Sequence, residues 1–310
     1  MKFPGRRKTK HYFPVTDKGR TSFKEPGLGK SKAYIVGIDQ LLVDIEIEVG
    51  DEYLKQYDFA KGQSFIIDDI LCEKVYSECR EKGLIRGEFP GGAVGNTLHN
   101  FSVLSENECY ALGSIKKQIE VGDYAFKYLA KTSGLVDMTY LQPAEKPMGR
   151  ALCFITPDME RTFAISKGCM NDFHEKFVPE DVIKNSSALL ISAYTLRAGD
   201  DPIYNATIRA CEIAKMYKVP VVMSLGTSNL IASKVEFIRD FSTKYVSVLA
   251  MNQDEAEALT GLIDDPLLAC EKILDLVDMA LVTVGQKGLY LAGFSDQSEL
   301  RETNEPLVTK

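Results

Sequence analysis

Strands and helices alternate regularly along the second half of this 310-residue chain, and that alternation limits the folds open to it. From Pro179 onward, short apolar segments alternate with segments of helical periodicity. Strands are expected at 188–193, 219–225, 246–251, 280–284 and 289–293, and helices at 202–217, 233–242, 253–259 and 266–276. Strands that are apolar on both faces are typical of parallel sheets covered by helices on both sides. The pattern therefore predicts a doubly wound, mostly parallel α/β fold.

The first half of the chain predicts a buried strand followed by a smaller, half-exposed sheet. Residues 33–38 are almost entirely apolar, whereas apolar and acidic side chains alternate over 41–49. A period of two indicates a strand with one exposed face. Together with strands around 86–91 and 150–166, this strand predicts a small β-sheet lid that stands off the main body. The other expected elements are a helix over 64–82, a strand over 109–115 and a helix over 123–131.

Charge and composition exclude several classes of protein. The net charge of -7 argues against a general nucleic-acid binder. The sequence has no apolar run of the roughly 18 residues that a membrane helix needs, and no apolar signal segment at its start, so we expect a cytoplasmic protein without a membrane partner. Seven cysteines without C-x-x-C spacing are expected to be reduced core thiols.

The first 32 residues differ in charge from the rest. They hold ten lysines and arginines against Asp17 and Glu25, and they are rich in proline and glycine. This basic arm is expected either to be mobile or docked on the surface, or to provide a specific anion or partner site. The remaining residues, 33–310, are expected to form one domain.

A glycine-rich loop, Gly91-Gly-Ala-Val-Gly-Asn96, runs directly into an apolar helical pattern. Glycines let a backbone approach a ligand closely, and the first N–H groups of a helix are free to bind one. Asn96 or Thr97 is expected to cap the helix. The simpler alternative is a tight turn before a packed helix.

Polar or glycine-rich groups follow several of the expected strands. They are Asp39, Arg197, Ser224–Thr227, Asn252–Glu255 and Thr283–Gly285. Ligands of open α/β sheets bind beyond the carboxyl ends of the strands. The sequence therefore predicts one ligand cleft at that edge.

Three short motifs resemble those of one enzyme family. They are G-G-x-x-x-N at 91–96, N-x-x-E at 252–255 and T-x-G-x-x-G at 283–288, and their order and spacing resemble the ribokinase, or PfkB-type, family of carbohydrate and nucleoside kinases. The resemblance covers about residues 33–295. It implies a ribokinase-like fold with a β-sheet lid, and ATP and Mg²⁺ as cofactors, with K⁺ as a further candidate.

The resemblance also implies the residues of a sugar site. Asp44 stands where the family has an acidic residue that binds two ribose hydroxyls, which suits a carboxylate because it accepts two hydrogen bonds. The alternative is that Asp44 is an ordinary outward-facing strand residue. The other expected substrate-binding residues are Asp39, Gly91, Gly92, Gly95, Asn96 and Arg197. Arg197 is placed there only by its position after a strand, and a surface salt bridge is its alternative role.

For the nucleotide, the resemblance implies a second set of residues. Ser224, Thr227, Thr283, Gly285 and Gly288 are expected to bind ATP. Asn252 and Glu255 are expected to hold Mg²⁺ and phosphate through water, since Mg²⁺ keeps several waters and takes few protein ligands. Asn252 can equally be a helix cap with Glu255 as its third-position partner, and the two roles are compatible.

Within the family, the opening segment and the run Val36-Gly-Ile-Asp-Gln40 are most similar to the bacterial inosine-guanosine kinases. This implies ATP-dependent phosphorylation of inosine and guanosine in purine salvage. Two alternatives stay open: a non-catalytic nucleoside-binding protein on the same scaffold, and a family kinase for adenosine or another sugar. A homodimer through the lid or an exposed sheet surface is a candidate assembly.

One family motif has no counterpart. The G-A-G-D turn, whose aspartate is the family's catalytic base, does not occur, so no catalytic residue is assigned in this chain. The elements that would follow Gly288 in the family are expected to be missing in part. We therefore expect a chain that is truncated relative to the family and weakly active or inactive.

Overall fold

The computed structural model describes residues 34–293 and 307–309, so the basic arm and its boundary at residue 32 lie outside the described residues. The chain forms two compact units, which are described separately. Unit 1 comprises the described parts of Met1–Val36, Pro179–Gly199 and Thr207–Lys310, and unit 2 comprises Gly37–Val178 and Asp200–Ala206. The chain passes from one unit to the other within the buried strand β1 (Ile35–Ile38).

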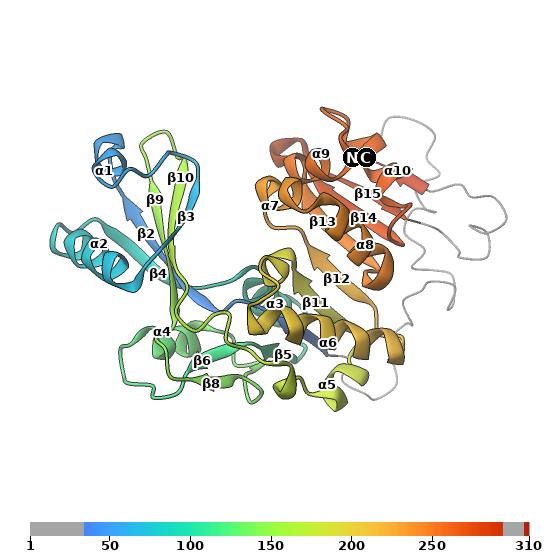
Figure 1. The fold of residues 1–310 in the computed structure, drawn as a ribbon, viewed down its shortest axis with the longest axis horizontal. Helices are drawn as coiled ribbons and strands as arrows, with labels where there is room; N and C mark the ends of the chain where they lie inside the picture. The colour runs from blue at the N-terminus through green and yellow to red at the C-terminus, as the bar shows by residue number, and fades with distance from the viewer. Residues whose placement is uncertain (1–33, 294–306, 310) are drawn as a thin grey trace. The chain divides into compact units, whose positions relative to one another are not determined.

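Unit 1 is built on parallel strands, as its apolar segments predict (Figure 1). These are β11 (Ala188–Ser192), β12 (Val221–Ser224), β13 (Val248–Asn252) and β14 (Met279–Thr283), each paired in parallel with the next. The strands β15 (Leu289–Gly293) and β16 (Leu307–Thr309) continue the sheet in the antiparallel sense. Residues such as Leu249, Ala280 and Val282 are fully buried between the sheet and its helices.

The helices of this part of the chain follow the strands closely. They are α5 (Glu180–Lys184), η3 (Ala193–Leu196), α6 (Pro202–Tyr217), α7 (Ser228–Ser233), α8 (Val235–Tyr245), α9 (Gln253–Thr260), α10 (Pro266–Ile273) and η4 (Gly285–Lys287). The predicted helix 233–242 corresponds to α8, and the additional helix α7 directly before it was not predicted. Thr227 caps α7 by accepting the Leu230 N–H, a local signal that apolar periodicity alone does not reveal.

Unit 2 contains the predicted lid as a five-stranded sheet in the order β3-β10-β9-β2-β4. Its strands are β2 (Leu42–Glu48), β3 (Ser64–Ile67), β4 (Ile85–Gly91), β9 (Gly149–Ile155) and β10 (Arg161–Ser166). The alternation predicted for β2 is confirmed, because Val43, Ile45 and Ile47 are fully buried. They pack against apolar side chains of a neighbouring helix, including Cys72 and Val75.

The rest of unit 2 consists of short strands and helices. They are β5 (Cys109–Leu112), β6 (Ser114–Lys116), β7 (Val136–Asp137), β8 (Gln142–Ala144), α1 (Asp51–Gln56), α2 (Asp69–Glu81), α3 (Ala93–Ser105), α4 (Tyr124–Lys131) and η2 (Glu175–Phe177). The strand expected over 109–115 is therefore two strands, with a break at Gly113.

The helix expected over 64–82 was wrong in its first part. Residues 64–67 form β3, which pairs in parallel with β10. The helix begins only after Asp68, whose side chain accepts the Leu71 N–H. Ile70, an apolar residue of the predicted helix, is 83% exposed. Backbone pairing with a strand distant in the sequence overrides the local helical periodicity here.

The prediction that the cysteines are reduced thiols in the core is confirmed. All seven cysteines are buried and none forms a disulfide. Among the described residues, no helix combines the length and the apolar character needed to cross a bilayer.

Candidate active site

In unit 2, the glycine-rich loop closes onto Asp39, which follows β1 at its carboxyl end. The Gly95 N–H at the start of α3 donates a 2.8 Å hydrogen bond to Asp39 Oδ2. Gly92 has a φ of +101°, and a Cβ there would lie 2.4 Å from the same oxygen. Glycine is therefore required at position 92 both by the backbone conformation and by the close approach to Asp39.

The cap prediction for α3 was wrong. The helix begins at Ala93 with Gly92 as its N-cap, so Asn96 and Thr97 lie inside the first turns and cannot cap it. The Asp39 carboxylate, which lies outside the helix, caps α3 instead by accepting a hydrogen bond from the Gly95 N–H. Asn96 is exposed on the same first turn.

Asp44 lies on the opposite face of β2 from the buried core. Its register partner on β4 is Phe89, and a Cβ at the nearby Gly91 would lie 2.7 Å from Asp44 Oδ2. Burial, and secondarily the charge of Glu46, raises the pKa of Asp44 from 3.8 to about 6. The structure therefore brings Asp39, Asp44 and the glycines of the loop together in one unit.

Tyr128 on α4 also belongs to this group, although sequence reasoning missed it. Its side chain is 2% exposed, and its hydroxyl oxygen would lie 2.7 Å from a Cβ placed at Gly95. Burial raises the Tyr128 pKa, and the charges of Asp39 and Asp44 act in the same direction. The sequence gives no signal for it, because α4 meets the loop only through the tertiary fold.

Asp39 makes the stability of the fold depend on pH. Burial raises its pKa from 3.8 to about 7, against hydrogen bonds from Gly95, Gln40 and Val94 that lower it. Between these pH values the folded chain holds a proton that the unfolded chain has released, so stability falls as the pH rises from about 4 to about 7 and then levels off.

We expect Asp39→Asn to flatten this part of the stability profile, because an amide does not titrate. Urea unfolding of both proteins between pH 4.5 and 8 measures the slope. Asp44 contributes a decline of the same sign that ends near pH 6, so the difference between the two proteins should be clearest from pH 6 to 7. An identical slope in the variant would show that Asp39 is not the titrating group.

In unit 1, Asn252 and Thr283 are direct neighbours at the carboxyl ends of β13 and β14. Asn252 caps α9 by accepting the Glu255 N–H at 2.9 Å, and the Glu255 carboxylate accepts the Asn252 backbone N–H at 3.1 Å. The capping-box alternative is thus present. Glu255 is 5% exposed, and burial raises its pKa. One amide and one carboxylate, both oxygen donors, fit an ion that keeps most of its own waters.

The other residues expected to bind nucleotide lie on the same unit. Gly285 and Gly288 have positive φ angles and open space where a Cβ would be, and the Val284 N–H donates to the Gly288 carbonyl at 2.8 Å. Ser224 ends β12, and Thr227 caps α7. The open space at Gly285 and Gly288 leaves the backbone of this turn accessible.

Arg197 follows the short helix η3 and is half-buried. Its guanidinium lies 5.0 Å from the ring centroid of Tyr194. Gly226 lies beside the same ring, since a Cβ there would come within 2.9 Å of it. The ion-pair alternative is not realised with any described residue, and Arg197 is instead held by a tyrosine.

Comparison with known proteins shows the family of this chain. The model of the pfkB carbohydrate kinase family matches residues 73–307. The chain belongs to the pfkB family of carbohydrate kinases. It is 47% identical over 310 residues to the guanosine-inosine kinase of Escherichia coli K12, an alignment that covers 99% of this chain and 71% of that protein. The proteins of that name from two further E. coli strains match to the same extent.

Solved structures confirm the ribokinase-like fold of this pfkB-family kinase. A probable sugar kinase from Rhizobium etli superimposes with a TM-score of 0.74 at 20% identity, covering 86% of this chain and 78% of that chain. Adenosine kinase from Sinorhizobium meliloti superimposes with a TM-score of 0.73 at 22% identity, covering 84% of this chain and 77% of that chain. At these identities the likeness concerns the fold alone.

Proposed function

We propose that this pfkB-family kinase transfers the γ-phosphate of ATP to the 5′-hydroxyl of guanosine and inosine. The observation that carries the proposal is the site in unit 2. There Asp44, half-buried on an open sheet face, lies against the glycine loop that Asp39 closes. The 47% identity to a guanosine-inosine kinase supports the choice of nucleoside.

In this proposal the two carboxylates have different roles. Asp44 accepts hydrogen bonds from the two ribose hydroxyls, which requires its ionised form and therefore a pH above about 6. Asp39 holds the glycine loop and the first turn of α3 in place. Gly91, Gly92, Gly95 and Asn96 border the sugar, and Arg197 contacts the base or the product phosphate.

On unit 1, Thr283, Gly285, Gly288, Ser224 and Thr227 form the proposed ATP site. Asn252 and Glu255 would hold Mg²⁺, which would neutralise charge on the transferred phosphate when bound. Dependence on K⁺ is proposed from the family resemblance, and replacing K⁺ by Na⁺ in the assay tests it.

The metal role of Asn252 can be separated from its capping role. Loss of a cap costs about 1 kcal/mol, so we expect Asn252→Ala to lower the free energy of unfolding by about that amount. Asp265→Ala, which removes the cap of α10, should have a similar cost. Only Asn252→Ala should also lose the thermal stabilisation that MgATP gives to the unchanged chain. Equal stabilisation of both variants by MgATP would assign Asn252 to capping alone.

Transfer of labelled γ-phosphate from ATP tests the function directly, with guanosine, inosine, adenosine and ribose as acceptors. Transfer to the first two above the others is the expected result, and Asp44→Asn is the control for the site. Equal or faster transfer to adenosine or ribose would support a family kinase of different specificity. The sequence lacks the G-A-G-D motif, and that favours a second candidate, a nucleoside-binding protein without turnover. Binding of guanosine without transfer would support it.

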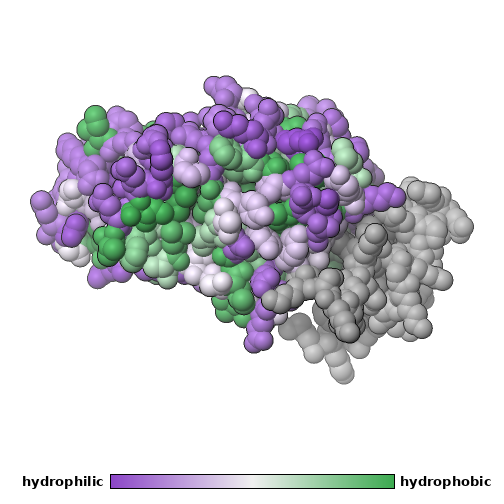
Figure 2. Space-filling model, turned by 90° about the horizontal axis from the view of Figure 1, so that it is seen from below, coloured by the Kyte–Doolittle hydropathy of each residue, from purple (hydrophilic) through white to green (hydrophobic). Residues whose placement is uncertain are grey.

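A homodimer is proposed as the assembly. Side chains of unit 2 such as Ile66 and Met159 are 49% and 72% exposed, which leaves apolar surface on the five-stranded sheet and its hairpin for a second copy to cover. Figure 2 shows a face on which apolar residues gather into patches between hydrophilic ones. Sedimentation of the chain at several concentrations measures the state.

A further inference from the structure

The exposed face of β2 carries three acidic residues in a row, and only two of them are accounted for. Asp44, Glu46 and Glu48 alternate with the buried Val43, Ile45 and Ile47, so all three lie on the open face of the sheet. Asp44 is the proposed ribose ligand, and Glu48 forms an ion pair with Arg86. The side chain of Glu46, between them, makes no hydrogen bond or ion pair with any described residue.

An aromatic ring lies next to Glu46 on the same face. Glu46 pairs with Gly87 on β4, and Asp44 pairs with Phe89. A Cβ at Gly87 would lie 2.4 Å from Phe89 Cε2, so the Phe89 ring lies over Gly87. Phe89 is 46% exposed. The Lys131 ammonium lies 5.2 Å from the centroid of this ring. The part-exposed ring extends from beside Asp44 to beside Glu46.

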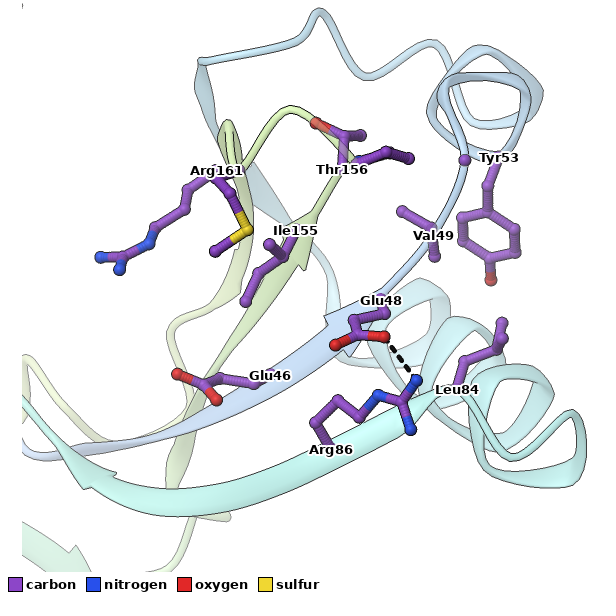
Figure 3. Close-up of a pocket in the computed structure, with 12 residues that line it drawn as sticks. Glu46, Glu48, Val49, Tyr53, Leu84, Arg86, Ile155, Thr156 and Arg161 are labelled. Atoms are coloured by element: carbon purple, nitrogen blue, oxygen red, sulfur yellow. Dashed lines mark hydrogen bonds and ion pairs between the residues drawn. The ribbon is translucent and has the colours of Figure 1, made fainter.

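Beyond Glu46 the sheet face is hollowed. The hollow has a volume of about 760 Å³, within the range of small-molecule sites, and its wall includes Ile155, Val49 and Leu84 (Figure 3). Arg161 lines the hollow as well, but no ion pair joins it to Glu46. The face thus offers space and a part-exposed aromatic ring next to a carboxylate side chain that has no partner among the described residues.

The spacing of these groups suits a nucleoside. Residues two apart on a strand are about 7 Å apart, comparable to the distance from the ribose hydroxyls to the far edge of the purine. At that edge, hypoxanthine and guanine carry an N1–H donor, and guanine adds a 2-amino group. Adenine instead presents an N1 lone pair. An ionised carboxylate only accepts hydrogen bonds, so one placed opposite N1 binds the first two bases and is repelled by the N1 lone pair of adenine, whose 6-amino donor lies one ring position away.

We propose that Glu46 recognises the purine base by accepting its N1–H hydrogen, while Phe89 stacks on the base. The inference rests on the proposed nucleoside site and assigns its choice of 6-oxopurines over adenine to one side chain. Glu46 is a specificity-determining residue in this scheme and takes no part in phosphate transfer.

Binding measured by calorimetry on the full 310-residue chain tests the inference without relying on turnover. A hydrogen bond to a charged group corresponds to roughly a 10- to 100-fold change in affinity. We expect Glu46→Gln to lower the affinity for guanosine and inosine by that factor. The affinity for adenosine should stay unchanged or increase. The unchanged chain should bind 1-methylinosine, which lacks N1–H but keeps the carbonyl, as weakly as adenosine.

Glu48→Gln is the matched control, because it removes a carboxylate from the same face two residues further along β2. It should leave all four affinities unchanged. If Glu46→Gln lowers the affinity for every nucleoside equally, or if the unchanged chain binds 1-methylinosine tightly, the proposal is wrong. Either result leaves the proposed kinase function intact. If the unchanged chain binds no nucleoside at all, both proposals fail for it.

Stacking of the base on residue 89 can be tested separately by tryptophan fluorescence. The sequence contains no tryptophan, so one introduced tryptophan gives the whole tryptophan signal. Phe89→Trp introduces a single fluorophore whose emission should be quenched when guanosine binds. Phe126→Trp, at a 38% exposed position on α4, is the control and should not respond. Binding of guanosine by calorimetry without any change in the emission of the Phe89→Trp variant would show that the base does not stack there.

Discussion

Replacing Asp44 by asparagine is expected to weaken guanosine binding at least about 100-fold. Two hydrogen bonds to a charged oxygen pair are lost, each worth about 1.5–3 kcal/mol, and each 1.4 kcal/mol is tenfold in affinity. The fold should not suffer. Burial raises the pKa of Asp44 to about 6, so its charged form is disfavoured in the folded chain and an uncharged amide relieves that cost at pH 7.5.

Calorimetric titration with guanosine and thermal unfolding at pH 7.5 measure the two effects. Glu48→Gln serves as the control for loss of one negative charge on β2. Unchanged affinity in Asp44→Asn would remove Asp44 from the site. A large fall in the melting temperature would instead show that the carboxylate supports the fold.

Gly92→Ala is expected to destabilise the chain by about 2–4 kcal/mol and to abolish nucleoside binding. The backbone at Gly92 has a φ of +101°, which a residue with a Cβ adopts at a cost of roughly 1–3 kcal/mol. The added methyl group would also lie 2.4 Å from Asp39 Oδ2 and 3.0 Å from the Gln40 carbonyl oxygen. The carboxylate that holds the Gly95 N–H must then move.

Gly122→Ala separates the two causes. Gly122 has a similar φ of +91° but nothing within 4 Å of a Cβ, so its variant should show the backbone cost alone and bind guanosine normally. Urea unfolding and calorimetry on both variants make the comparison. Equal losses of stability, with binding intact in both, would show that the contact with Asp39 can relax.

The parts of the fold that depend on local periodicity could be predicted from the sequence. The alternation of β2 and the apolar strands of unit 1 were found where expected, and α6 covers the predicted 202–217. The errors occur where a distant partner decides the structure. Residues 64–67 share helical spacing with the apolar positions of α2, but they pair with β10, almost one hundred residues further along the chain.

The site shows the same division. Gly92 was expected from the glycine-rich motif, Asp39 from its place after an apolar strand, and Asp44 from the family resemblance. The structure places all three together in unit 2. Tyr128, Phe89 and Glu46 carry no motif. Phe89 lies near the site through its register on β4, Tyr128 through the packing of α4, and Glu46 through the alternation of β2. Asn96 was expected as a cap, but the backbone of α3 already begins three residues earlier.

The strict alternation of β2 places two separate requirements on the same seven residues, Leu42–Glu48. Odd-numbered positions hold the core, and even-numbered positions lie on the open face of the sheet. A one-residue deletion before Val43 would exchange them and put three carboxylates into the core. Substitutions at the even positions escape this constraint. In the proposed site, substitutions at Asp44 or Glu46 can therefore change the substrate preference one residue at a time, without a change in the buried side chains of β2.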